Sequence, residues 1–175
     1  MGDTSNTVAT IIKQYDFNLF YARKLTEDVI PVHMTLVPGK GMENHPAFTL
    51  GHLISASALL FEDLGGDFSM PKGWDELFLR KGPGDTRLPE QDASKYPGKT
   101  ELIDELERQH EQVKTRLLSA SEHELMQPIK WRFQNYMSSL LDLTAFMCIT
   151  HENMHLGQLA CWRRALSYPS ALALL

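Results

Sequence analysis

The sequence predicts an all-α protein, a four-helix bundle with a long crossover between its second and third helices. Apolar residues recur every three or four positions in four long segments, as in helices with one buried face, and no segment has a convincing strand pattern. The turn-rich segment 67–99 is too long to link antiparallel neighbours, but it can return along a helix so that the second and third helices run parallel. At 175 residues and 43% hydrophobic composition, the chain is expected to form one domain, residues 1–175.

The first two helices are expected at 4–29 and 46–64. The first ends before Pro31, because the residue that precedes a proline avoids the helical conformation. An irregular link follows, and Asn44 is the expected cap of the second helix. Apolar residues cover much of the circumference of the second helix, which predicts deep burial, and Gly65-Gly66 end it.

The later helices follow a segment rich in proline and glycine that contains a short helical turn at 74–79. Thr100 is the expected cap of the third helix, because acidic residues fill the turn that comes after it. A capped turn is expected at 121–126, and Ser138 or Ser139 begins the fourth helix.

Two histidines, His151 and His155, lie four residues apart in the apolar-periodic run 140–166 of the fourth helix. Four residues of α-helix correspond to about 40° of rotation and about 6 Å of rise, so both rings leave the same face. A single inward histidine is more often a hydrogen-bonded core residue. Two on one stripe, however, have up to four ring nitrogens that need a partner when buried, and a divalent cation binds one nitrogen of each ring. The pair therefore predicts a metal site. Its face is the apolar one, since it also carries Leu140, Thr144, Met147, Cys148, Gln158 and Trp162.

The motif His151-Glu152-x-x-His155 also matches the H-E-x-x-H helix of zinc proteases. That site needs a third ligand downstream, whereas 156–175 offers only Cys161, which lies off the ligand face. Glu152 is expected on a solvated flank of the helix. The protease interpretation is therefore disfavoured.

The motif Glu152-x-x-His155 matches the E-x-x-H of di-iron helical bundles, and Glu107-x-x-His110 supplies a second copy. Such a site needs two further inward carboxylates. The first two helices offer only Glu27 and Glu62, both near helix ends, so this interpretation is weak as well.

His52, in the second helix, is the leading candidate for a third ligand. It follows Gly51, a residue that lets another helix or a ligand approach closely. His110 is a spare candidate near the apolar stripe of the third helix. Three imidazoles leave a coordination position vacant, as in catalytic metal sites, whereas Cys148 as a fourth ligand would make the site structural. Gln158, one turn beyond the second histidine of the pair, either bonds a metal-bound group or fills a polar gap in the core.

These residues resemble the DinB-like proteins, which include the YfiT-type metal-dependent hydrolases and bacterial thiol S-transferases. The matching motifs are Gly51-His52-Leu53 and His151-x-x-x-His155-x-Gly157-Gln158, and the helix spacing agrees over nearly the whole chain. The resemblance implies a four-helix bundle with a long connection between helices two and three, a three-His divalent metal site, and frequent homodimers. By position, the ligands would be His52, His151 and His155. Phe48 stands where many relatives have Trp, and the links 32–45 and 67–99 are this chain's own, so the resemblance does not carry the substrate over.

The expected function is that of an enzyme whose cation activates water or a thiol for attack on a small electrophile, as a hydrolase or a thiol S-transferase. Zinc or nickel is expected first, with iron, manganese or copper as alternatives, because imidazole suits several of these metals. The substrate is expected to be a small molecule, with a low-molecular-weight thiol among the candidates. No catalytic acid or base is identified. The alternative is a non-catalytic, stress-associated metal-binding module that dimerises through its helices.

Composition limits the other classes. A net charge of −5 without a Lys/Arg cluster argues against nucleic acid. No apolar run reaches the length of about 18 residues that a membrane span needs, and the polar start 1–7 lacks a secretory pattern, so a cytoplasmic protein is expected. Cys148 and Cys161 are about 19 Å apart along one helix and cannot bond each other, which fits a reducing compartment.

Overall fold

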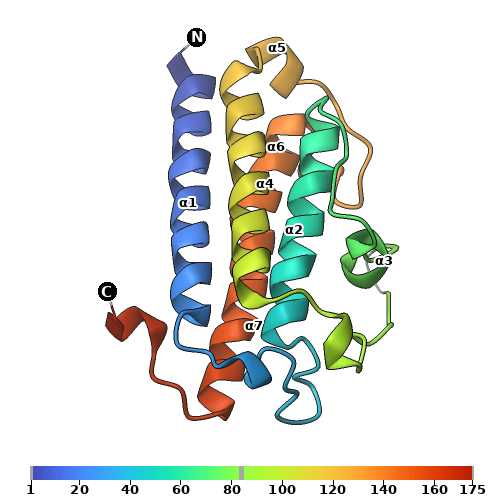
Figure 1. Ribbon diagram of the computed structural model, residues 1–175. Helices are drawn as coiled ribbons and strands as arrows, with labels where there is room; N and C mark the ends of the chain where they lie inside the picture. The colour runs from blue at the N-terminus through green and yellow to red at the C-terminus, as the bar shows by residue number, and fades with distance from the viewer. Residues whose placement is uncertain (1, 83–84, 175) are drawn as a thin grey trace.

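The computed structural model describes residues 2–82 and 85–174, and the long elements in them are helices (Figure 1). Among the described residues, the extended pairing is confined to an isolated bridge between Pro128 and Ser139, so the all-α prediction is confirmed. The long elements are α1 (Gly2–Thr26), α2 (Pro46–Asp63), α4 (Lys99–Ser119) and a last column made of α6 (Leu140–Ala145), the π-helical segment η3 (Phe146–His151) and α7 (Glu152–Ala165). The short ones are η1 (Pro31–His33), α3 (Trp74–Phe78), η2 (Ala93–Lys95), α5 (Glu122–Leu125) and η4 (Ala171–Leu174).

The long helices pack side by side, with α2 against α4 and α7, and α1 against α4 and α7. Helices α2 and α4 run in the same direction, and the link 64–98 returns along their length (Figure 1). The α6–η3–α7 column and α1 run the opposite way. The predicted crossover is therefore present, and it carries α3 against α2.

Two of the predicted helix starts are wrong. The cap of α2 is His45 rather than Asn44, and its Nδ1 accepts a hydrogen bond from the backbone N–H of Phe48 at 3.2 Å. Helix α4 begins one residue before Thr100, because the carboxylate of Glu101 reaches back to accept from the backbone N–H of Gly98 at 2.9 Å. This side chain satisfies a free N–H of the first turn, so the helix needs no hydroxyl cap.

Other boundaries agree more closely with the prediction. Ser121 and Ser139 cap α5 and α6, each accepting from the backbone N–H three residues later. Helix α2 starts at the expected residue and is mostly buried. Helix α1 ends at Thr26, before the expected 29, because the Thr26 side chain and the following turn already occupy the last carbonyls.

The core consists of two apolar clusters stacked along the bundle. One cluster surrounds Leu53 and Trp162, and the other surrounds Ile11 and Val113. Both cysteines are free, Cys148 buried and Cys161 exposed, as their separation predicts. Within the described residues, none of the helices combines the length and hydrophobicity required to cross a bilayer.

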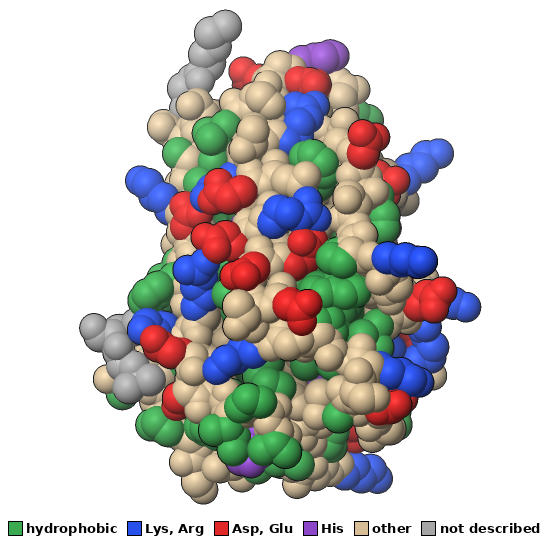
Figure 2. Space-filling view, viewed as in Figure 1, with side chains coloured by type: hydrophobic (Ala, Val, Ile, Leu, Met, Phe, Trp, Pro, Cys, Tyr) green, Lys and Arg blue, Asp and Glu red, His purple; other side chains and the backbone are tan. Residues whose placement is uncertain are grey.

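The face over α1 and α4 carries acidic and basic side chains close together (Figure 2). Ion pairs join the two helices there, from Arg23 to Glu107 and from Lys114 to Asp16. This face therefore presents no extended field of one sign.

Candidate metal centre

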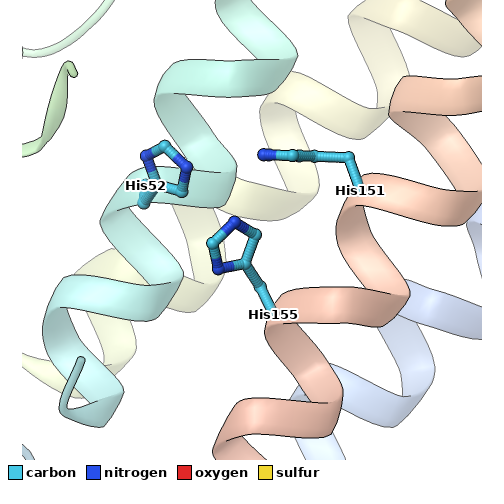
Figure 3. A group of neighbouring side chains, drawn as sticks. All are labelled: His52, His151 and His155. Carbon is cyan, nitrogen blue, oxygen red and sulfur yellow. The ribbon is translucent and has the colours of Figure 1, made fainter. Parts of the chain in front are cut away.

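Three imidazoles converge between α2 and the last column (Figure 3). A ring nitrogen of each of His52, His151 and His155 lies within 4.8 Å of those of the other two. The ring centroids are 4.6 Å apart for the His52–His155 and His151–His155 pairs and 5.3 Å apart for His52–His151. All three side chains are half-buried, so the cluster is enclosed on one side and accessible on the other.

The geometry of the last column brings His151 and His155 together. The π-helical segment ends at His151 and α7 begins at Glu152, so the two histidines are one α-helical turn apart. His52 comes from the middle of α2, which packs against both η3 and α7. The sequence spacing supplies two of the three rings, and helix packing supplies the third.

Burial keeps these rings neutral. It lowers the pKa of His52 to about 3, the neighbouring His155 and His151 act in the same direction, and the Phe78 backbone opposes the shift. Burial lowers the pKa of His151 to about 4. It lowers the pKa of His155 as well, although a hydrogen bond with the Gln158 side chain opposes this shift. At neutral pH the rings are therefore uncharged and carry free lone pairs, which metal binding requires.

The cluster contains buried ring nitrogens without partners. Nδ1 of His52 and Nδ1 of His151 are buried and make no hydrogen bond to any residue that the structure describes. Leaving a buried polar atom unpaired costs about 1–3 kcal/mol. Three neutral imidazoles, two of them with an unpaired buried nitrogen, fit a divalent transition-metal ion.

Phe48 and Gly51 position His52. The ring of Phe48 is stacked on that of His52, with centroids 5.9 Å apart and planes 8° apart, and the Arg80 guanidinium carbon lies 4.4 Å from the Phe48 centroid. A Cβ on Gly51 would lie 2.2 Å from the ring of Phe78, which is fully buried. The close approach expected at Gly51 is therefore made by α3.

Gln158 and Cys148 lie outside the cluster of converging ligand atoms. Gln158 is exposed at the rim, where it accepts a hydrogen bond from Asn44 Nδ2 at 3.3 Å. Cys148 is fully buried in the apolar cluster around Ile11, and burial together with Glu152 raises the pKa of its thiol. The π-helical turn that contains Cys148 and His151 changes the angle between these two side chains from that of an α-helix. Cys148 therefore does not complete the site as a fourth ligand.

Two other sequence expectations are wrong. His110 is not a spare ligand, because its Nε2 is hydrogen-bonded to Glu152 Oε1 at 2.9 Å and its ring is stacked on Tyr15 with centroids 3.6 Å apart. Glu152 is not on a solvated flank, since only 3% of it is exposed. Helix α7 is surrounded by other helices on that side as well, which a helical wheel of one segment does not reveal.

A cavity of about 500 Å³ adjoins the imidazole cluster. The rings of Trp131, Phe133 and Phe146 line it, each pair with centroids 5.3 Å apart, and we refer to them as the aromatic wall. Arg80 and Arg132 line it too. Sequence reasoning missed both arginines, because each lies in an irregular segment where no periodicity indicates which way a side chain points.

Comparison with known proteins agrees with this geometry. A family model described as the DinB superfamily matches residues 20–159, most of the chain, and this range contains all three converging histidines. No curated protein matches the chain. The resemblance drawn from the short histidine motifs is therefore confirmed over most of the sequence. The chain belongs to the DinB superfamily.

Proposed function

We propose that the protein is a metal-dependent enzyme in which His52, His151 and His155 hold a divalent cation and the adjoining cavity holds a small substrate. One observation carries the proposal: ring nitrogens from two helices converge within 4.8 Å beside a cavity of about 500 Å³. A cavity of this size suits a small molecule. Three histidine donors leave a position free for a reactant, as in catalytic zinc sites, whereas structural sites are closed by a fourth protein ligand.

A cation bound there supplies a nucleophile near neutral pH, since it lowers the pKa of a coordinated water or thiol. The chain's own residues prepare the site for it. The lowered pKa values of His52 and His151 keep their lone pairs free, and Phe48 restricts the rotation of the His52 ring. The aromatic wall gives the cavity a largely apolar lining beside the three imidazoles. No carboxylate is among the described residues that line the cavity, so the imidazole cluster is the chain's centre for chemistry there. The reaction we propose is attack on a small electrophile, as a hydrolase or a thiol S-transferase.

Zinc or nickel is the ion we propose first, with iron, manganese or copper as alternatives. Metal analysis of protein purified without a His-tag should find one ion per chain. His52→Ala and His151→Ala should each weaken zinc binding at least tenfold, because each removes one of three donors. His123→Ala, which removes an exposed histidine of α5, is the matched control and should bind as the unmodified chain does. Equal zinc affinity in His52→Ala and the unmodified chain would contradict the proposal.

Catalysis can be tested with a panel of low-molecular-weight thiols and model electrophiles, together with activated esters for hydrolysis. We expect turnover that depends on added metal, that is lost in His151→Ala and that is retained in His123→Ala. If no member of the panel turns over faster than in His151→Ala, while zinc still binds, the protein is better described as a non-catalytic, stress-associated metal-binding module.

We also propose that the protein works as a homodimer in the cytoplasm. Phe17 and Phe20 are 45% and 42% exposed on α1, and they offer apolar surface suited to a helix-to-helix contact. Light scattering coupled to size exclusion should give twice the chain mass of 19.9 kDa. A monomer at micromolar concentration would rule out a stable dimer.

A further inference from the structure

The cavity beside the imidazole cluster combines apolar walls with two positive charges. The aromatic wall and the half-exposed Leu59 make most of its lining hydrophobic. Arg80, from the link after α3, and Arg132, from the link between α5 and α6, supply the charges. They come from separate segments of the chain, and both line the same space as the three imidazoles.

Neither arginine is neutralised by the part of the chain that the structure describes. Arg80 and Arg132 make no ion pair or hydrogen bond there, and each lies over an aromatic ring instead. The guanidinium carbon of Arg80 is 4.4 Å from the Phe48 centroid, and that of Arg132 is 5.2 Å from the Phe133 centroid. Such stacking holds the stems in place and leaves the N–H groups available for an acceptor.

Arg87, on the same link as Arg80, does have an acidic partner. Its guanidinium is held by both carboxylate oxygens of Asp85, the acid that acts most strongly on Arg80. Asp85 is thus already paired with another arginine. Burial lowers the pKa of Arg80 even though the nearby Asp85 carboxylate opposes the shift, so the charge of Arg80 is partly removed from water and only partly compensated.

We infer that the substrate is a small amphiphilic anion, whose apolar body lies against the aromatic wall and whose carboxylate or phosphate group is bound by Arg80 and Arg132. The inference rests on the proposed function for the role of the cavity as the substrate site. Guanidinium groups bind both kinds of anion through paired N–H donors. With the anionic group held by the arginines, the rest of the molecule lies along the wall that leads to His151 and His155.

The test uses the full chain without metal, so that an anion cannot bind to a cation in the imidazole cluster. Calorimetric titration compares phenylacetate, phenyl phosphate and the uncharged phenylacetamide. We expect the better of the two anions to bind at least tenfold more tightly than the amide, and its identity assigns the substrate as a carboxylate or a phosphate. If the amide binds as tightly as both anions, or if neither anion binds, the inference is wrong.

Variants assign the effect to the two arginines. Arg80→Gln and Arg132→Gln should each weaken binding of the preferred anion at least fivefold and leave that of phenylacetamide unchanged, while Arg80→Lys should recover part of the affinity. Arg164→Gln removes the same charge from the exposed side of α7 and is the matched control. Circular dichroism and the zinc affinity of each variant verify its fold. Unaltered anion binding in both glutamine variants would overturn the inference, whereas a chain that fails to bind zinc would defeat the proposed function and leave the anion result standing.

Discussion

Glu152 is a carboxylate enclosed in the core directly after His151. It is 3% exposed, and its described side-chain partner at hydrogen-bond distance is Nε2 of His110, 2.9 Å from Oε1. Burial raises the pKa of Glu152, and the interactions with His110 and with the Asn18 side chain oppose that rise. Oε2 of Glu152 and Nδ1 of His110 have no partner among the described residues. The pair ties α7 to α4, which otherwise share few close contacts.

Replacing His110 by alanine should destabilise the protein by about 3–5 kcal/mol at pH 8, because it removes the imidazole that pairs with a buried carboxylate. The loss should be smaller at pH 5 than at pH 8, since raising the pKa of a carboxyl increases the fraction that is protonated and neutral in mild acid. Urea denaturation at the two pH values measures the difference. The double variant His110→Ala/Glu152→Gln, which removes the charge as well, should lose less at pH 8. A loss below about 1 kcal/mol in the single variant would show that the carboxylate is solvated.

Buried histidines should make the metal-free protein sensitive to mild acid. Burial lowers the pKa values of His45 and His151 to about 4 and that of His52 to about 3, from an ordinary 6.5. Below pH 6.5 these histidines bind protons in the unfolded chain but not in the folded chain. Their contribution to the free energy of unfolding is therefore complete above pH 6.5 and is lost as the pH falls toward 4. Each such histidine contributes about 1.4 kcal/mol per pH unit in this window.

Urea denaturation between pH 7.5 and pH 5, in the presence of a chelator, measures this slope. His45→Gln should reduce the slope by about 1.4 kcal/mol per pH unit, which corresponds to one proton. His123→Gln, at an exposed position, should leave the slope unchanged. A stability that does not change over this range would contradict the expected burial of neutral rings.

At the scale of the element, the positions of α2 and α3 depend on one missing side chain. The ring of Phe78 occupies the space where a Cβ on Gly51 would lie, so α3 packs directly on the backbone of α2 next to His52. The link of 35 residues, 64–98, is held to the bundle in part by this contact. The same contact places Arg80, two residues after α3, at the cavity.

Gly51→Ala should therefore lower stability by about 1–3 kcal/mol, because the added methyl group overpacks a buried site. Gly157→Ala is the matched control: among the described residues, no atom outside its chain neighbours and its own helix backbone lies within 4 Å of the Cβ position. Alanine favours a helix over glycine by about 1 kcal/mol, so this variant should stabilise α7. Thermal unfolding of both variants gives the comparison. Stabilisation by Gly51→Ala would mean that α3 does not pack on α2 in solution.

At the scale of the whole molecule, a bound ion would connect the centre of α2 to α7, elements almost a hundred residues apart in sequence. Binding to the folded state alone stabilises a protein by about 2.7 kcal/mol when free metal is at a hundred times its Kd. The stabilisation should appear as a single cooperative shift, because the clusters around Leu53 and Ile11 lie on the same long helices.

Zinc should accordingly raise the Tm of the unmodified chain by several degrees, and a chelator should reverse the shift. His52→Ala should show little or no shift, since only the α7 pair remains, and His123→Ala should respond as the unmodified chain does. Equal shifts in His52→Ala and the unmodified chain would place the stabilising zinc elsewhere.

What sequence analysis predicted well depends on local geometry. His151 and His155 are four residues apart, which places them one helical turn apart on the same face. Ser121 and Ser139 cap α5 and α6 because each accepts from a free N–H group in the first turn of its own helix. Predictions failed where another element decides the outcome. Glu152 is buried in the core and paired with His110 of α4, and Cys148 is turned away by a π-helical segment for which the apolar periodicity gives no signal.

The sequence by itself determined the helical class, the crossover between α2 and α4, and a pair of rings on one face of the last helix, because these follow from periodicity and chain length. Tertiary structure alone decided that His52 meets that pair, that His110 pairs with Glu152, and that Arg80 and Arg132 line one cavity. The physical reason is that helix packing sets which faces meet and at what depth, and contacts between distant segments leave no periodic trace in either segment.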